Sequence, residues 1–353
     1  MDPRLRAAND NQDHRLIGDI QILLIVAILV AVAFDFTNGF HDTANAIATS
    51  VSTRAMTPSQ AVVVAATFNL IGALVTVNLF HAKVSNTIAG TLAIKAGLVV
   101  VMAALIGAIA WNLLTWYLGL PSSSTHALIG GLVGAGIAAS GGFDGVRWPS
   151  LGRQILALVT SPPIGFAVAA VFMTLLLLGV YRARPAPLNR TFRWIQVAAA
   201  ALVSFSHGGN DAQKTMAAIA LALVATGHLA KFSVPDWVVL LSATAIAFGT
   251  YAGGWRIIRT LGWRIYKLEP ATGLSAQLMA ATVIQVASAY GLPVSTTHVV
   301  TGSVMGAGAA RNLPALKWGV GANIVTAWLL TIPATALMGW TAFAILNTAG
   351  LRG

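Results

Sequence analysis

Two segments place polar and charged side chains on one face of a helix inside long apolar stretches. Their members are spaced three or four residues apart, which aligns side chains along a helix. They are Asp35, Asn38, Asp42, Asn45 and Thr49 in one segment, and Ser204, His207, Asp211 and Lys214 in the other. Ionisable groups at membrane depth are costly and usually mark a polar pathway or a paired site. The alternative is a buried network that only packs helices, but a matched pair favours a site.

Two loops add consecutive hydroxyl groups after a proline. These groups are Ser123, Ser124 and Thr125 in one loop, and Ser295, Thr296 and Thr297 in the other. Ser and Thr cap helices well, and a helix N-terminus offers free N–H groups with a partial positive charge. The loops therefore predict a cradle for a tetrahedral oxyanion, with ordinary helix capping as the alternative. His126 and His298 follow the hydroxyls, and a structural role is favoured for them over proton transfer.

The loops belong to an internal repeat. Residues 119–136 and 291–308 are identical at ten of their eighteen positions, and a weaker match pairs 35–46 with 204–215. Both pairs keep the same order, which indicates a duplicated unit. Transporters commonly place a substrate site between two inverted repeats, although duplication alone does not show inversion. The predicted organisation is a polar tail over 1–21, repeats over 22–180 and 195–353, and a basic linker over 181–194.

Composition points to a membrane protein. Of 353 residues, 57% are apolar and 9% are charged, whereas soluble domains contain about 25% charged residues. This excludes a soluble enzyme, a disordered regulator and a nucleic-acid reader, despite the formal net charge of +11. Because cysteine is absent, thiol chemistry is excluded. The expected surroundings are membrane lipid, with no nucleic-acid partner.

The uncharged runs set the architecture. A helical span needs about 20 apolar residues, so the runs accommodate roughly ten to twelve transmembrane or half-spanning helices. Their lack of strict alternation favours an all-α polytopic protein over a barrel. The 181–194 linker carries four arginines and no acidic residue, which predicts that it faces the cytoplasm. No phosphate-gripping loop of the GxxxxGK[ST] type is present, so ATP-driven transport by this chain is not expected.

The paired motifs resemble those of the inorganic phosphate transporter (PiT) family. The segments that carry the resemblance are DFTNGFHDTANAIATSVSTRAM, SFSHGGNDAQK and the two Pro-Ser/Thr-His loops. The resemblance implies inverted repeats, an outside N-terminus, a homodimer, and phosphate uptake coupled to H⁺ or Na⁺. It also implies that the site is lined by the hydroxyl loops with Asp42, Asn45, Asn210 and Asp211, which would hold the coupling ion as well. The second half departs from the pattern, with Gln213 and Lys214 where Ala44 and Asn45 stand in the first.

Charge supports coupled transport. Phosphate is an anion, and two carboxylates beside it would repel it strongly at low dielectric. A cation or proton that accompanies it can bridge the carboxylates to the anion, or the O–H groups of the phosphate can donate to them. A divalent metal–phosphate complex is a further candidate substrate. Lys214 either compensates one carboxylate or extends to water. The residues expected to be accessory are Asp35, Asn38, Gln213 and Lys214.

The favoured function is a phosphate symporter of the inner (cytoplasmic) membrane that is not an enzyme and carries no cofactor or metal except Na⁺. The first alternative is a symporter of sulfate or another oxyanion on the same scaffold. An anion channel ranks lower. A hydrolase using Ser124 or Thr297 also ranks lower, because catalysis would need only one copy of the duplicated loop.

Overall fold

The computed structural model describes residues 3–93 and 97–351, with the side chains of 3–19 and 185 outside the description. Within these residues the fold is all-α, as predicted, with twelve α-helices and no strand. The first six are α1 (Pro3–Ser52), α2 (Pro58–Phe80), α3 (Lys83–Ala89), α4 (Leu98–Leu118), α5 (Ser124–Ser140) and α6 (Trp148–Val180). The other six are α7 (Pro185–Ala225), α8 (Asp236–Ala252), α9 (Trp255–Arg259), α10 (Pro270–Ala289), α11 (Thr296–Asn312) and α12 (Trp318–Thr348).

Five helices are long and apolar enough to cross a membrane. They are α1 from Ile20 onward, α2, α4, α6 and α12, and a sixth is reached if α8 and its bent continuation through Arg264 form one span. The sequence predicted ten to twelve spanning or half-spanning helices, and the described residues form twelve α-helices. Five or six of these are long and apolar enough to span a membrane. The chain is a multi-pass membrane protein.

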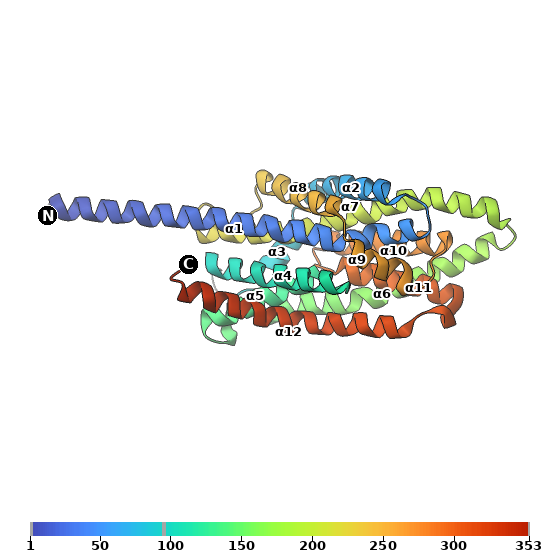
Figure 1. Ribbon diagram of the computed structural model, residues 1–353. Coiled ribbons are helices and arrows are strands. Elements are labelled where there is room, and N and C mark those ends of the chain that lie inside the picture. The colour runs from blue at the N-terminus through green and yellow to red at the C-terminus, as the bar shows by residue number, and fades with distance from the viewer. Residues whose placement is uncertain (1–2, 94–96, 352–353) are drawn as a thin grey trace.

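The helix order repeats across the two halves. Helix α1 packs on α8 as α7 packs on α2, and α5 packs on α12 as α11 packs on α6. Figure 1 shows α1 and α7 running in opposite directions along the bundle, and α6 and α12 doing the same. This antiparallel course supports the inverted relation between the repeats, which stays a prediction together with their boundaries.

The hydroxyl loops begin at glycines in the left-handed conformation. Gly119 ends α4 with a φ of 68°, and the equivalent Gly291 follows α10 with a φ of 71°. Only glycine adopts this conformation without a steric penalty, so α4 stops at Gly119 and the chain after α10 turns at Gly291. The next helices, α5 and α11, then begin at the hydroxyl residues. The predicted short helices that start at these loops are therefore present in both halves.

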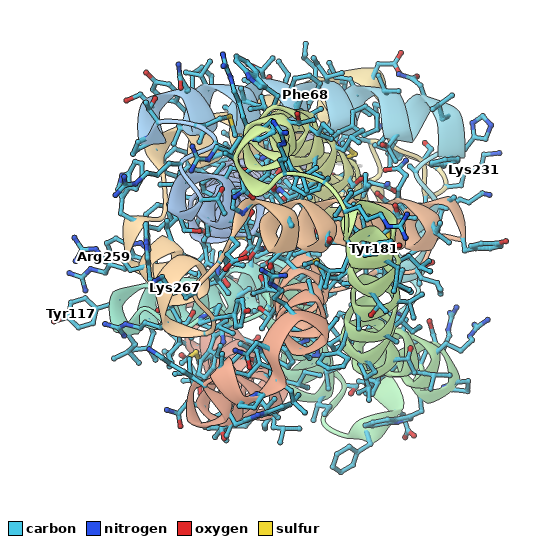
Figure 2. All side chains as sticks on the ribbon, turned by 90° about the vertical axis from the view of Figure 1, so that its right-hand side faces the viewer. Phe68, Tyr117, Tyr181, Lys231, Arg259 and Lys267 are labelled. Carbon is cyan, nitrogen blue, oxygen red and sulfur yellow. The ribbon has the colours of Figure 1, made fainter. Side chains whose placement is uncertain are left out.

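The bundle is viewed nearly end-on in Figure 2, from the α6–α7 connection where Tyr181 lies. Tyr117 and Arg259 project from one side of the bundle and Lys231 projects from the opposite side.

Between the helices, small residues allow close contact. A Cβ on Gly134 would collide with the backbone of Ala336 in α12, and one on Gly306 with the backbone of Phe166 in α6.

We expect Gly134→Ala and Gly306→Ala to destabilise the protein by about 1–3 kcal/mol each, because overpacking must move a neighbouring helix. The measurement is thermal unfolding of the purified proteins in detergent. Gly179→Ala is the matched control, since a Cβ at Gly179 meets no atom within 4 Å. Equal melting temperatures for all three variants and the parent would contradict the packing role.

Candidate functional site

The carboxylates of the two repeats meet at one imidazole. His207 Nε2 of α7 lies 3.2 Å from Asp211 Oδ2 and 3.8 Å from Asp42 Oδ2 of α1. Asp42 is 2% exposed and Asp211 is 0% exposed. Both parent helices pass through this region unbroken, so the pair is positioned by side-by-side helix packing rather than by a loop.

The nitrogen of His207 that faces the carboxylates needs positive charge beside it. His207 Nδ1 lies 3.0 Å from Asn69 Oδ1, whose amide nitrogen donates to Thr250 Oγ1 at 2.7 Å. Because that amide orientation makes Asn69 Oδ1 an acceptor, Nδ1 is the donor of this bond. A neutral ring would then point the lone pair of Nε2 at two carboxylates. A proton on Nε2, or a cation held between the three groups, removes this conflict.

These three side chains also form a potential cation site. One ligand atom from each of Asp42, His207 and Asp211 lies within 4.8 Å of the others, and all three residues are buried. Two carboxylates and one imidazole are suitable ligands for a divalent metal ion, and carboxylate oxygens suit Na⁺ or a proton as well. The donor set therefore fits a small cation.

The hydroxyl loops converge on the carboxylates. Ser124 Oγ at the start of α5 donates to Asp42 Oδ2 at 3.1 Å, and Thr297 Oγ1 at the start of α11 donates to Asp42 Oδ1 at 3.3 Å. Thr296 Oγ1 donates to Asp211 Oδ2 at 3.5 Å. The N-termini of both short helices, with their free N–H groups, thus meet at the same point.

Lys214 is compensated inside the protein and does not extend to water. Its side chain is fully buried, and its Nζ donates to Asp211 Oδ2 at 2.8 Å. The same ammonium donates to Ser124 Oγ at 2.7 Å and to Thr125 Oγ1 at 3.3 Å. Thr125 Oγ1 in turn donates to the carbonyl of Val294 at 3.1 Å.

The two predicted asparagines of the site, Asn45 and Asn210, make different hydrogen bonds. Asn45 Nδ2 donates to Thr297 Oγ1 at 2.9 Å, while its buried Oδ1 has no partner among the residues described. Asn210 satisfies its neighbours best with its oxygen accepting from Ser288 Oγ at 2.8 Å. Its nitrogen then donates to Asp211 Oδ1 at 3.3 Å.

Several predicted site residues have structural contacts instead. Ser123 and Ser295 are helix caps, each accepting from the backbone N–H of the histidine three residues later at 3.2 Å. Gln213 Oε1 accepts from the backbone N–H groups of Val84 and Ser85 at 3.0 and 3.3 Å, which fixes the start of α3.

Two further accessory candidates lie earlier on α1. Asp35 and Asn38 are fully buried, and within the described part of the chain their side-chain oxygens and nitrogens have no hydrogen-bond partner. They are not among the contacts of the Asp42–His207–Asp211 cluster.

Two histidines belong to the network but were given no role from the sequence. One is His207, and its spacing of four residues from Asp211 was the available signal. The other is His41, whose Nδ1 lies 2.6 Å from Asp42 Oδ1. Its Nε2 lies 3.2 Å from Thr115 Oγ1 and 3.3 Å from Ser122 Oγ.

Comparison with known proteins identifies the family to which the chain belongs. The model of the phosphate transporter family matches residues 38–187 and 180–339. The chain belongs to the phosphate transporter family. The resemblance in the paired motifs is thereby confirmed.

The relatives of this phosphate transporter family member match it along most of its length. A probable low-affinity inorganic phosphate transporter of Rhizobium meliloti is 48% identical over 320 residues, covering 90% of this chain and 94% of the relative. One of Bacillus subtilis is 43% identical and covers 93% and 99%. A solved structure described as the sodium-dependent phosphate transporter has a TM-score of 0.85 at 27% identity, covering 93% of this chain and 99% of that chain. These matches are transporters, in keeping with the expectation that the chain is not an enzyme.

Proposed function

We propose that this protein takes up inorganic phosphate across the cytoplasmic membrane together with a cation. The family supports phosphate as substrate, and the solved relative described as sodium-dependent supports Na⁺ among the candidate ions. The observation that carries the coupling is the buried cluster of Asp42, His207 and Asp211. The ammonium of Lys214 offsets only one of the two carboxylates, so the cluster attracts phosphate only when further positive charge is present beside it.

The hydrogen bonds suggest an order of binding. Ser124 and Thr297 each donate a hydroxyl hydrogen bond to Asp42 in the structure. A cation that binds the oxygens of Asp42 competes for the same lone pairs, so both hydroxyls are released. They then turn toward a phosphate oxygen, next to the N–H groups of α5 and α11. Cation binding thus prepares the anion site.

Burial requires a conformational step. The side chains of Asp42, Asp211, Ser124 and Thr297 are each at most 2% exposed. Phosphate reaches them only if packed helices separate on one side of the membrane and then on the other. Relative movement of two repeats around a fixed central site is the usual way in which transporters achieve this.

Uptake into proteoliposomes tests the proposal. Labelled phosphate or labelled sulfate is offered under imposed proton or sodium gradients, each alone and with the other anion as unlabelled competitor. Accumulation that collapses when the driving gradient is removed supports symport. Flux indifferent to both gradients indicates a channel, and accumulation of sulfate in preference to phosphate indicates another oxyanion carrier.

A second candidate substrate is a divalent metal–phosphate complex. The Asp42–His207–Asp211 donor set favours it, because these ligand types bind divalent ions. Uptake of Mn²⁺ that requires phosphate, in parallel with uptake of phosphate that requires Mn²⁺, would support a joint substrate. Phosphate uptake unaffected by complete removal of divalent ions would exclude it.

We expect the 181–194 linker to face the cytoplasm and the N-terminal tail to face outside. The basic linker supports this orientation through the positive-inside rule. Ala8→Cys and Ala186→Cys, made separately in this cysteine-free chain, are exposed to an impermeant thiol reagent on intact cells. Labelling at position 8 alone is the expected result, and labelling at position 186 alone would reverse the topology.

The homodimer implied by the family stays a prediction. Its test is the mass of the detergent-solubilised protein.

A further inference from the structure

On the basis of the symport function above, we propose that Lys214 is a built-in cation. Its ammonium supplies in the second half-site (Asp211 and Lys214) the charge that a mobile coupling cation supplies in the first half-site (Asp42 and Asn45). Transport therefore uses one mobile cation fewer per phosphate than a site with two equivalent halves would use.

The repeat makes Lys214 the counterpart of Asn45. The weaker motif pair has an offset of 169 residues, which relates Asp42 to Asp211 and Asn45 to Lys214. Both side chains also reach across to the hydroxyl loop of the opposite repeat. Asn45 Nδ2 donates to Thr297 Oγ1 at 2.9 Å and to Thr296 Oγ1 at 3.5 Å.

Lys214 makes the equivalent contacts in the other direction. Its Nζ donates to Ser124 Oγ at 2.7 Å and Thr125 Oγ1 at 3.3 Å. Ser124 and Thr125 are the repeat equivalents of Thr296 and Thr297, at the offset of the stronger motif pair. The two side chains therefore occupy matched places in the structure as well as in the sequence.

The matched places differ in what they can bind. Asn45 offers a buried Oδ1 that has no partner among the described residues, and its Nδ2 contacts the same Thr297 hydroxyl that donates to Asp42. A carboxylate and an amide oxygen are oxygen ligands of the kind that hard cations prefer. Lys214 offers no oxygen and instead brings three donors and a fixed positive charge, held 2.8 Å from Asp211.

The fixed charge cannot leave the second half-site. Lys214 is part of α7 and is fully buried. Its ammonium therefore stays beside Asp211 while phosphate and the mobile cation bind and leave. Removing one partner of a buried ion pair leaves an uncompensated charge, which is strongly unfavourable. A chain that lacks this ammonium must therefore recruit a cation from solution to keep Asp211 compatible with an anion.

The test replaces Lys214 by its repeat counterpart. Wild-type protein, Lys214→Asn and the charge-retaining Lys214→Arg are compared in proteoliposomes for charge moved per phosphate and for the number of cations on which uptake depends. For Lys214→Asn, we expect both quantities to rise by one, and for Lys214→Arg we expect the wild-type values. Lys214→Asn with wild-type values in both measurements would overturn the proposal.

A reciprocal variant tests the proposal even if Lys214→Asn fails to fold or to transport phosphate. Asn45→Lys places an ammonium in the first half-site, and we expect phosphate binding by the purified protein to lose its requirement for a cation. An unchanged cation requirement in folded Asn45→Lys would contradict the built-in cation. Absence of phosphate uptake by the wild type under every gradient would instead reject the symport function, so the two failures are distinguishable.

Discussion

Asp42→Asn and Asp211→Asn should each abolish concentrative phosphate uptake while the protein remains folded. Asp42 accepts hydroxyl hydrogen bonds from Ser124 and Thr297 and lies beside His41. An amide of the same shape keeps the packing but removes the charge that holds a cation. At Asp211 it also leaves the buried ammonium of Lys214 without its carboxylate, so Asp211→Asn should lower the melting temperature more than Asp42→Asn does. Losing about 3 kcal/mol of charge-assisted interaction corresponds to more than a hundredfold loss of affinity.

Initial rates of labelled phosphate uptake check this, with expression and melting temperature measured on the same preparations. Asp35→Asn is the matched control, because Asp35 is a buried carboxylate on the same helix whose repeat counterpart is the uncharged Ser204. Its effect should be milder. Wild-type transport by both Asp42→Asn and Asp211→Asn would show that the carboxylate pair is not the site.

Thr297→Val and Ser124→Ala should each lower phosphate affinity by about 10–150-fold. A hydrogen bond to a charged group contributes about 1.5–3 kcal/mol, and each 1.4 kcal/mol is a factor of ten. Thr297→Val keeps the shape of the side chain and deletes the donor, so it separates anion binding from packing. The measurement is phosphate binding to the purified proteins at fixed salt and pH.

Thr125→Val provides the comparison within the same loops. The hydroxyl of Thr125 donates to the carbonyl of Val294 and not to a carboxylate, so its removal should weaken phosphate binding less. If all three variants bind phosphate as the wild type does and lose only thermal stability, the three hydroxyls contribute to packing alone. Loss of affinity without loss of stability supports the oxyanion cradle.

The sequence predicted which helices carry the site but not which neighbouring residues face it. The spacing around Asp42 and Asp211, and their repetition, indicated two polar faces, and the structure brings these together. Gln213, which neighbours Lys214 in the sequence, was predicted as an accessory site residue, but sequence position alone does not say which way its side chain points. Successive residues on a helix point about 100° apart, so Lys214 reaches Asp211 while Gln213 faces α3.

The same limit applies to His207 and to the loop serines. His207 lies on the predicted polar face, but its contact with Asp42 depends on how α1 packs against α7, which local periodicity does not determine. Ser123 and Ser124 are adjacent and chemically alike. Whether the helix begins at one or the other decides which hydroxyl caps the helix and which contacts Asp42.

The contacts between the two halves also bear on how such a chain could have arisen. Asp42 of the first half is held by Thr297 of the second, while Lys214 of the second holds Ser124 of the first. Each half thus supplies hydrogen-bond partners to the candidate site residues of the other. A half-length ancestor with one set of motifs would have formed these contacts only by pairing with a second copy, and the predicted inversion of the repeats requires that copy to be inserted in the opposite orientation. Gene fusion would then have fixed that pairing and freed the two copies to diverge, one toward Asn45 and the other toward Lys214.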